Sequence, residues 1–356
     1  MISSDRSSPE IRVLVADDSA VMRTALSNML QASPLVRVCG TARDGIETVE
    51  KTKLLRPDVV TLDVQMPRMD GIEALKRIMG ECPCPVIMVS RMTQEGAEVT
   101  IEALSAGAFD YLPKEDLQNN GDLLRLQRSL LEKVEAAAHS SLASNRIVYS
   151  SPPPIIALRE KSQVVPKIAV IGTSTGGPKA LQEIIPELPE KLPIPVLIVQ
   201  HMPRGFTGPL AKRLDGISKL NVCEAGEGDQ IEAGTVYIAP AGQHTTLFGS
   251  GASVWVSLSD EPADSMHKPS VDVTMSSVAE VFGRYALGII LTGMGSDGVK
   301  GMRAIQDAGG ITVGQSEATC AVYGMPRSCA ETGVLQRVVP LMEVPAFIKQ
   351  SVRFKG

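Results

Sequence analysis

Long hydrophobic runs are missing from this sequence. No apolar run reaches the length of a membrane span, and residues 1–6 lack the apolar core of a signal peptide. We therefore expect no membrane insertion and a cytoplasmic location. An excess of basic residues is missing too, because the formal net charge is -5. Neither nucleic acid nor an anionic membrane surface is expected as a partner.

Paired cysteine motifs are also missing. The six cysteines are scattered along the chain: Cys39, Cys82, Cys84, Cys223, Cys320 and Cys329. One residue separates Cys82 from Cys84, which is not the C-x-x-C spacing of a redox pair, and no zinc-ligand spacing occurs. The pattern is typical of free thiols in a reducing compartment.

The composition predicts a globular protein of two domains. The chain has 356 residues, of which 44% are hydrophobic and 21% are charged, and this is enough for two ordinary cores. A segment rich in serine and proline, with Pro152–Pro154 at its centre, cannot support a packed element. We expect a tail over residues 1–9, one domain over 10–130, a linker over 131–166 and a second domain over 167–356.

The first domain alternates strands with helices. Five apolar segments have the length and pattern of strands: residues 11–16, 36–40, 58–63, 85–90 and 110–112. Apolar residues at helical spacing separate them, as in Met22, Leu26, Met29 and Leu30. Five such alternations predict an α/β fold with a parallel, doubly wound sheet.

Charged and hydroxyl side chains stand at the carboxyl ends of these strands, where such sheets collect their functional groups. They are Asp17, Asp18, Asp63, Ser90 and Lys114. Three carboxylates in one crevice repel each other unless a hard cation such as Mg²⁺ binds among them. A hydroxyl and an ammonium nearby suit a phosphoryl group. Taken singly, an aspartate here is more often a helix cap, a role open to Asp18 or Ser19.

These residues resemble a response-regulator receiver domain over about residues 10–130. The run Asp63–Gly71 has the highly specific pattern D-x-x-M-P-x-M-D-G, and Tyr111-x-x-Lys114 extends the match. The resemblance implies a flavodoxin-like fold. It also implies that Asp63 is the phospho-acceptor and that Lys114 contacts the phosphoryl group. The implied Mg²⁺ ligands are Asp17, Asp18, Asp63 and the Gln65 carbonyl. Ser90 and Tyr111 are the implied switch pair.

The second domain is organised around a glycine-rich turn. An apolar run over residues 167–171 is typical of a buried strand, and the turn Gly172–Gly177 follows it. Pro178 then suits the first turn of a helix. A serine between a strand end and a helix N-terminus can attack a substrate, and the following amides can receive an oxyanion. Ser174 is therefore a candidate nucleophile.

Two further strands end in groups that would complete a catalytic triad. Residues 195–200 lead directly into His201, and residues 286–291 lead into a loop that contains Asp297. The carboxyl edge of one parallel sheet would bring both side chains to Ser174. His201 would then take the serine proton, and Asp297 would fix the imidazole tautomer.

Other interpretations of the two loops remain open on the residues alone. Residues 172–176 match the G-x-S-x-G motif of α/β-hydrolases, although the triad order in that family is Ser, Asp, His. The same turn resembles a phosphate-cradling loop of a flavin or nucleotide binder. Residues 293–298 match G-x-G-x-x-G, but no acidic residue stands near position 313 to bind a ribose.

The roles of single residues also have rivals. His244 and His267 compete with His201 as the base, since each lies in a polar loop. Ser174 would more often be a helix cap, and Asp297 could cap the helix that follows it. An inactive esterase fold that acts only through interactions is a further alternative.

The second domain resembles the catalytic domain of chemotaxis protein-glutamate methylesterases. The runs that carry the resemblance are Gly172–Pro178, Gln200–Thr207, Ile238–His244, Pro269–Asp272, Leu291–Gly298 and Tyr323–Pro326. Together with the receiver they cover nearly the whole chain, and the pairing is more specific than either half. The resemblance implies two doubly wound parallel-sheet domains, a flavodoxin-like receiver and a Rossmann-like methylesterase domain.

The resemblance also implies a function. Ser174, His201 and Asp297 would hydrolyse glutamate methyl esters on methyl-accepting chemoreceptors, release methanol and deamidate receptor glutamines. Thr175 and the backbone around Met294 would position the substrate and its oxyanion. A histidine kinase would phosphorylate Asp63 with Mg²⁺ bound, and this would relieve inhibition by the receiver. No cofactor in the catalytic domain and a monomeric state are expected.

Overall fold

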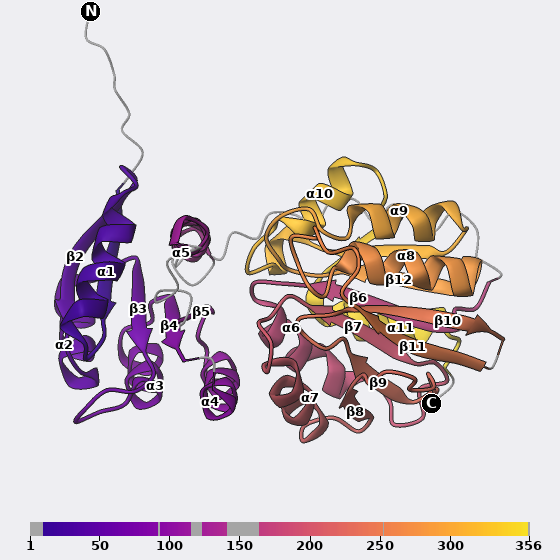
Figure 1. Ribbon diagram of the computed structural model, residues 1–356, viewed down its shortest axis with the longest axis horizontal. Coiled ribbons are helices and arrows are strands. Elements are labelled where there is room, and N and C mark those ends of the chain that lie inside the picture. Colours follow the sequence, from indigo (N-terminus) through magenta and orange to yellow (C-terminus); the bar gives the residue numbers. More distant parts are fainter. Residues whose placement is uncertain (1–9, 92, 115–122, 141–163, 252, 355–356) are drawn as a thin grey trace, which may run out of the picture. The chain divides into compact units, whose positions relative to one another are not determined.

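The computed structural model describes residues 10–91, 93–114, 123–140, 164–251 and 253–354 (Figure 1). The chain divides into two compact units, residues 1–147 and 148–356, and each is described by itself. Among the described helices, none is long and apolar enough to cross a membrane.

The first unit is a five-stranded parallel sheet of order β2-β1-β3-β4-β5. Its strands are β1 (Ile11–Ala16), β2 (Val36–Ala42), β3 (Val59–Asp63), β4 (Val86–Ser90) and β5 (Asp110–Pro113). Its helices are α1 (Ala20–Gln31), α2 (Gly45–Leu55), α3 (Gly71–Glu81), α4 (Gln94–Ser105) and α5 (Leu123–Ala138). The predicted α/β fold and all five predicted strands are confirmed.

Helix α5 corrects the boundary that the sequence predicts after residue 130. It continues to Ala138 because its apolar residues keep helical spacing beyond that point. Leu126, Leu130, Val134 and Ala137 are all buried. The first unit therefore includes this helix to its end, and much of the predicted linker, residues 141–163, lies outside the described residues.

The second unit is built on a seven-stranded sheet of order β14-β13-β12-β6-β7-β9-β8, parallel throughout. Its strands are β6 (Ile168–Thr173), β7 (Val196–Gln200), β8 (Asn221–Glu224), β9 (Thr235–Ile238), β12 (Ala286–Ile290), β13 (Ile311–Gln315) and β14 (Arg337–Val339). Successive strands extend from β6 to one side and then, from β12, to the other. The crevice between β6 and β12 is thus the switch point where such sheets bind ligands.

Helices cover both faces of this sheet, with α8 and α9 on one face and α6 and α7 on the other (Figure 1). The helices are α6 (Gly177–Ile184), α7 (Thr207–Asp215), α8 (Val271–Phe282), α9 (Val299–Asp307), α10 (Met325–Glu331) and α11 (Val344–Ser351). Pro178 lies in the first turn of α6, as predicted from its fixed φ.

An antiparallel hairpin, β10 (His244–Ser250) and β11 (Ser253–Ser259), packs on α8. Thr274 of α8 donates to the Thr245 carbonyl, and the Leu247 amide donates to Ser277 Oγ. Buried apolar residues of α8 share one core with the hairpin and the sheet. Because α8 is held on two sides, its N-terminus is a fixed point beside the switch-point crevice.

Candidate functional site

The acidic pocket of the receiver forms at the carboxyl ends of two neighbouring strands. Asp17 and Asp18 follow β1, and Asp63 is the last residue of β3. One oxygen from each carboxylate lies within 4.8 Å of the others. The predicted meeting of these three side chains is confirmed, and oxygen donors of this kind are typical of a Mg²⁺ site.

Lys114 supplies a positive charge in this pocket. Its ammonium lies 2.7 Å from Asp63 Oδ2 and 3.0 Å from Asp17 Oδ2. Burial raises the pKa of Asp63 to about 6, although the ion pair with Lys114 opposes this rise. Burial lowers the pKa of Lys114, but the two carboxylates raise it more, so the net pKa lies above its usual value. Lys114 therefore stays charged beside the acceptor carboxylate.

The helix-cap role at the start of α1 belongs to Ser19. Its Oγ accepts a hydrogen bond from the Met22 amide at 3.4 Å. Asp17 Oδ1 accepts from the Ser19 amide at 2.9 Å, and Asp18 is exposed. Asp18 is thus not needed for the cap, and the Asp18 carboxylate is available to the acidic pocket.

The two predicted switch residues lie in different surroundings. Ser90 lines a cavity of about 200 Å³ together with Asp63, Gln65 and Lys114. Tyr111 is 6% exposed, and the ammonium of Lys133, from α5, lies 5.6 Å from the centre of its ring. The joint movement of Ser90 and Tyr111 stays a prediction.

The candidate nucleophile of the second unit follows β6 in the turn that leads into α6. The Ser174 amide donates to the Thr292 carbonyl at 3.1 Å, so this amide is engaged in the fold and does not serve as an oxyanion donor. Gly293 lies so close that a Cβ there would be 2.8 Å from Ser174 Cβ. The loop after β12 therefore packs directly on the nucleophile because residue 293 has no side chain.

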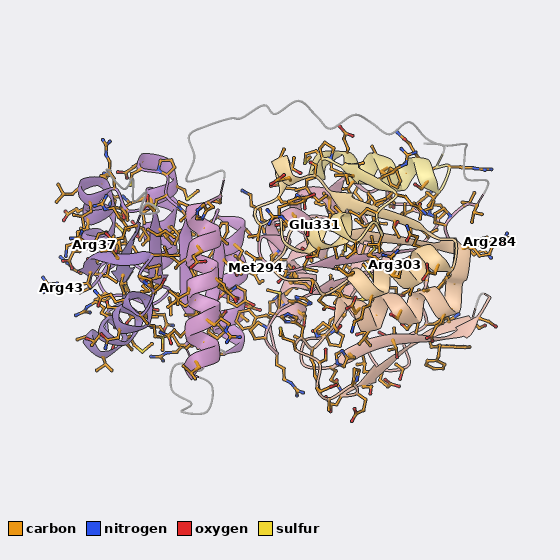
Figure 2. All side chains as sticks on the ribbon, turned by 90° about the horizontal axis from the view of Figure 1, so that it is seen from above. Arg37, Arg43, Arg284, Met294, Arg303 and Glu331 are labelled. Carbon is orange, nitrogen blue, oxygen red and sulfur yellow. The ribbon has the colours of Figure 1, made fainter. Side chains whose placement is uncertain are left out.

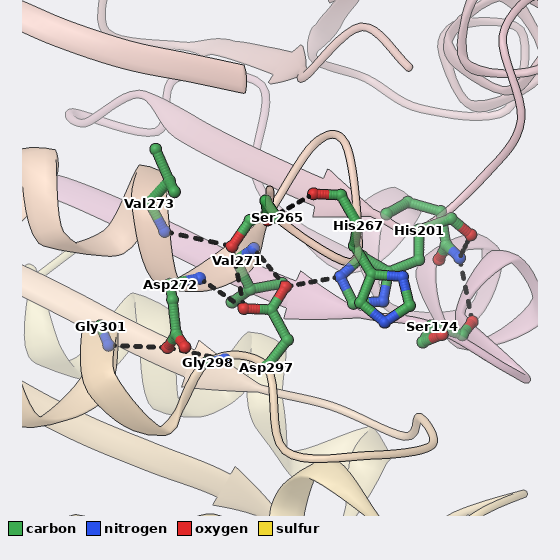
Figure 3. Close-up of polar contacts among 12 residues, drawn as sticks. Ser174, His201, Ser265, His267, Val271, Asp272, Val273, Asp297, Gly298 and Gly301 are labelled. Carbon is green, nitrogen blue, oxygen red and sulfur yellow. Dashed lines mark hydrogen bonds and ion pairs between the residues drawn. The ribbon is translucent and has the colours of Figure 1, made fainter. Parts of the chain in front are cut away.

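His201 and Asp297 form the hydrogen-bonded pair that the sequence predicts. His201 Nε2 lies 2.8 Å from Asp297 Oδ2. Because a carboxylate can only accept, Nε2 carries the proton and Nδ1 is the basic nitrogen. Nδ1 is buried and has no hydrogen-bond partner among the described residues. Figure 3 shows Asp297 and Ser174 on opposite sides of the histidine ring.

Asp297 is a cap, but of a helix that precedes it in the chain. Its oxygens accept from the amides of Val271 at 2.7 Å and Asp272 at 2.9 Å, and from Ser270 Oγ at 3.0 Å (Figure 3). The expectation of a cap on the following helix, α9, is therefore wrong. Burial raises the pKa of Asp297, but the bonds from His201 and the amides lower it more, so the net pKa lies well below its usual range.

A second carboxylate accepts hydrogen bonds from the backbone amides at the N-terminus of α9. Asp272, in the first turn of α8, accepts from the amides of Gly298 and Gly301, each at 2.9 Å. The loop of residues 293–298 is therefore tied to α8, and two amides that a dinucleotide pyrophosphate would need are occupied. The dinucleotide interpretation of this loop is not supported.

The two rival histidines have other surroundings. His244 is completely buried, accepts from the Ser270 amide at 3.2 Å through Nδ1 and lies 3.3 Å from the Pro262 carbonyl through Nε2. Burial lowers the pKa of His244, which favours this neutral tautomer. The ring of His267 stacks on that of His201 with centroids 4.0 Å apart. His244 is a structural residue, and His267 lies beside His201, the candidate base.

Thr175 and Met294 are the chain neighbours of the two residues that meet at the candidate nucleophile, Ser174 and Gly293. Thr175 is 5% exposed, and its carbonyl accepts from Thr292 Oγ1 at 3.0 Å. Met294 follows Gly293 and lies at the edge of the domain (Figure 2). Their oxyanion role stays a prediction.

Ser270, Asp272 and Thr292 are site residues that the sequence reasoning did not single out. Ser270 and Asp272 stand in the run Pro269–Asp272, whose pattern of serine followed by an acidic residue signals a helix start. That pattern does not indicate that the helix start faces Asp297, because the two segments are far apart in the sequence.

The folds and their sites define a class: a receiver with an acidic pocket, joined to an α/β domain with a Ser-His-Asp arrangement at its switch point. A family model described as CheB methylesterase matches residues 169–348, and one described as response regulator receiver domain matches residues 13–123.

Relatives match over nearly the full length. The protein-glutamate methylesterase/protein-glutamine glutaminase 2 of Nitratidesulfovibrio vulgaris is 44% identical over 360 residues, 95% of this chain and 98% of the relative. The protein-glutamate methylesterase/protein-glutamine glutaminase of Pyrococcus abyssi is 43% identical over 348 residues, 96% of this chain and 94% of the relative. The crystal structure of the Thermotoga maritima CheB methylesterase catalytic domain matches with a TM-score of 0.51 and 42% identity, covering 52% of this chain and 99% of that one.

The chain belongs to the CheB family of protein-glutamate methylesterases/protein-glutamine glutaminases, with an N-terminal receiver domain and a C-terminal methylesterase domain. It is accordingly a hydrolase of chemotaxis signalling that a receiver domain regulates.

Proposed function

We propose that Ser174, His201 and Asp297 hydrolyse methyl esters of glutamate side chains on chemoreceptors. The observation that carries this proposal is the His201–Asp297 pair, with Asp297 ionised at the N-terminus of α8 and Ser174 at the end of the neighbouring strand. A histidine held in one tautomer, with its second nitrogen buried and basic, is what an uncharged serine needs for activation.

The reaction proceeds in two halves. Ser174 Oγ attacks the ester carbonyl carbon while His201 Nδ1 takes the hydroxyl proton, and the imidazolium is stabilised by Asp297. The tetrahedral intermediate collapses, and methanol leaves with the proton from Nδ1. Water then gives a proton to Nδ1 and attacks the acyl carbon. Glutamate is released, and Ser174 recovers its proton.

Deamidation of glutamine follows the same course with ammonia as the leaving group. Both carbonyl groups pass through the same tetrahedral oxyanion, so one set of donors serves both reactions. We assign these donors to the backbone around Thr175 and Met294, since the Ser174 amide is bonded to Thr292.

The receiver regulates this activity through phosphorylation of Asp63. A histidine kinase supplies the phosphoryl group in the cytoplasm, and Lys114 pairs with the group once it is attached. Asp17, Asp18, Asp63 and the Gln65 carbonyl would hold Mg²⁺, and the ion when bound neutralises part of the phosphoryl charge.

The direct test is methanol release from methylated receptor membranes. We expect Ser174→Ala to release no methanol above background, whereas Ser250→Ala, which changes an exposed serine of the hairpin, keeps the full rate. Methanol release by Ser174→Ala at the wild-type rate would refute the proposed nucleophile.

A further inference from the structure

Gln200 is a buried amide between the nucleophile and the base. It is the last residue of β7, directly before His201, and is 2% exposed. In the sheet it pairs with Thr173, the residue before Ser174. A polar side chain buried at this depth needs hydrogen-bond partners, and its partners here lie in the catalytic loops.

The side chain joins the two loops through their carbonyl groups. Gln200 Nε2 donates to the Ser174 carbonyl at 2.9 Å and to the His201 carbonyl at 3.0 Å. Both partners can only accept, so the amide nitrogen is the group that faces them. Since the Ser174 amide is bonded to the Thr292 carbonyl, the backbone of the nucleophile is held from both neighbouring strands.

The other end of the same side chain is poorly satisfied. Gln200 Oε1 is buried and has no hydrogen-bond partner among the described residues. It faces Gly177, where an added Cβ would lie 2.1 Å away. An unpartnered buried acceptor destabilises a fold, so an apolar side chain of similar length would remove this cost while it also removes the two donated hydrogen bonds, and the two effects on stability oppose each other.

We propose that Gln200 is a positioning residue, which fixes the Ser174 hydroxyl relative to His201 Nδ1 by clamping the two carbonyl groups. The inference rests on the proposed function of Ser174 and His201. Without the clamp the turn can shift relative to the end of β7, and displacements near 1 Å can cost about 10²-fold in rate.

Two variants separate positioning from packing. Gln200→Met keeps the length of the side chain and removes both the donor and the orphaned acceptor. We expect kcat to fall about 10- to 100-fold with KM nearly unchanged, and the melting temperature to stay close to that of the wild type. Gln336→Met is the control. It removes a hydrogen bond from the side-chain amide of Gln336 to the Gly310 carbonyl, away from the site, and should leave kcat unchanged.

Gln200→Glu adds a test, because a role in packing alone predicts no dependence of its effect on pH. An ionised carboxylate cannot donate to either carbonyl group, whereas a protonated one can donate its single hydrogen to one of them, and burial favours the protonated form. The ratio of the kcat of Gln200→Glu to that of Gln200→Met should therefore rise as the pH falls from about 8 to about 6.

The experiment measures methanol release from methylated receptor membranes and, separately, the rate at which a fluorophosphonate labels Ser174 in the full chain. Both rates should fall in Gln200→Met and stay at the wild-type level in Gln336→Met. Wild-type rates in Gln200→Met, or a constant ratio between the two Gln200 variants across the pH range, would overturn the inference. If the wild type released no methanol, the proposed function would fail, while the labelling rates would still test the role of Gln200.

Discussion

At the scale of the residue, the proposed mechanism depends on which groups donate hydrogen bonds to the Asp297 carboxylate. Asp297 accepts from His201 Nε2, from Ser270 Oγ and from the amides of Val271 and Asp272. These donors keep the carboxylate ionised although it is largely buried. An ionised Asp297 fixes the proton on Nε2 and leaves Nδ1 as the proposed base.

Replacing this carboxylate by an amide should cost most of the activity. Asp297→Asn can present its NH₂ to His201 Nε2, which favours the tautomer with the proton on Nδ1, and that nitrogen then cannot accept the serine proton. We expect kcat to fall about 10³- to 10⁴-fold in the methanol assay. Asp307→Asn, an exposed change at the end of α9, should keep the rate. A loss of less than tenfold in Asp297→Asn would contradict the tautomer argument.

The raised pKa of Asp63 makes the receiver's stability depend on pH. The pKa is about 6 in the folded state, against 3.8 for the ordinary group, so the folded state binds more protons between these values. The free energy of unfolding therefore decreases as the pH rises through this window. Asp63→Asn removes the buried charge, and at neutral pH without divalent cations it should stabilise the receiver by on the order of 2–3 kcal/mol.

Calorimetry of the full chain measures this gain in stability. The single tryptophan, Trp255, lies in the catalytic unit, so its fluorescence shows which unfolding transition belongs to that unit. The gain from Asp63→Asn should shrink as the pH falls from about 6 and vanish well below 3.8, where the wild-type carboxyl is protonated in both states. An equal gain at every pH would show that charge is not its cause. Added Mg²⁺ should stabilise the wild type and leave the variant unchanged.

At the scale of the element, the sequence predicted which strands carry the site but not how their loops meet. Alternating strands and helices place Ser174, His201 and Asp297 at one sheet edge by rule. Whether Asp297 caps α8 or α9 depends on the path of the loop between β12 and α9, and Asp272 fixes that path from another segment. Such contacts between distant segments leave no periodicity in the sequence, so local patterns could not reveal the roles of Ser270, Asp272 or Gln200.

The close approach of the two loops can be tested at Gly293. In Gly293→Ala the new Cβ would lie 2.8 Å from Ser174 Cβ and 2.4 Å from Met325 Sδ, so the nucleophile has to shift. We expect kcat to fall at least about tenfold. Gly208→Ala, in α7, meets its nearest neighbour, Glu224 Oε2, at an ordinary 3.4 Å and should be active. Full activity of Gly293→Ala would show that the loop can yield without moving Ser174.

At the scale of the whole molecule, the sequence predicted two α/β units because each carries its own specific motifs. The D-x-x-M-P-x-M-D-G run and the carboxylates at strand ends define the receiver. The turn around Ser174 was the weaker argument for the second unit, since it also fits a phosphate loop. The predicted end of the first domain at residue 130 is too early, because the helical spacing of α5 continues to Ala138.

In the proposed function, phosphorylation of Asp63 controls hydrolysis at Ser174. The measurement is the initial rate of methanol release from methylated receptor membranes, with and without a small phosphodonor and Mg²⁺. We expect the wild type to be stimulated, Asp63→Asn to keep the basal rate without stimulation, and Ser174→Ala to be inactive under both conditions. Equal stimulation of Asp63→Asn and the wild type, or methanol release by Ser174→Ala, would contradict it.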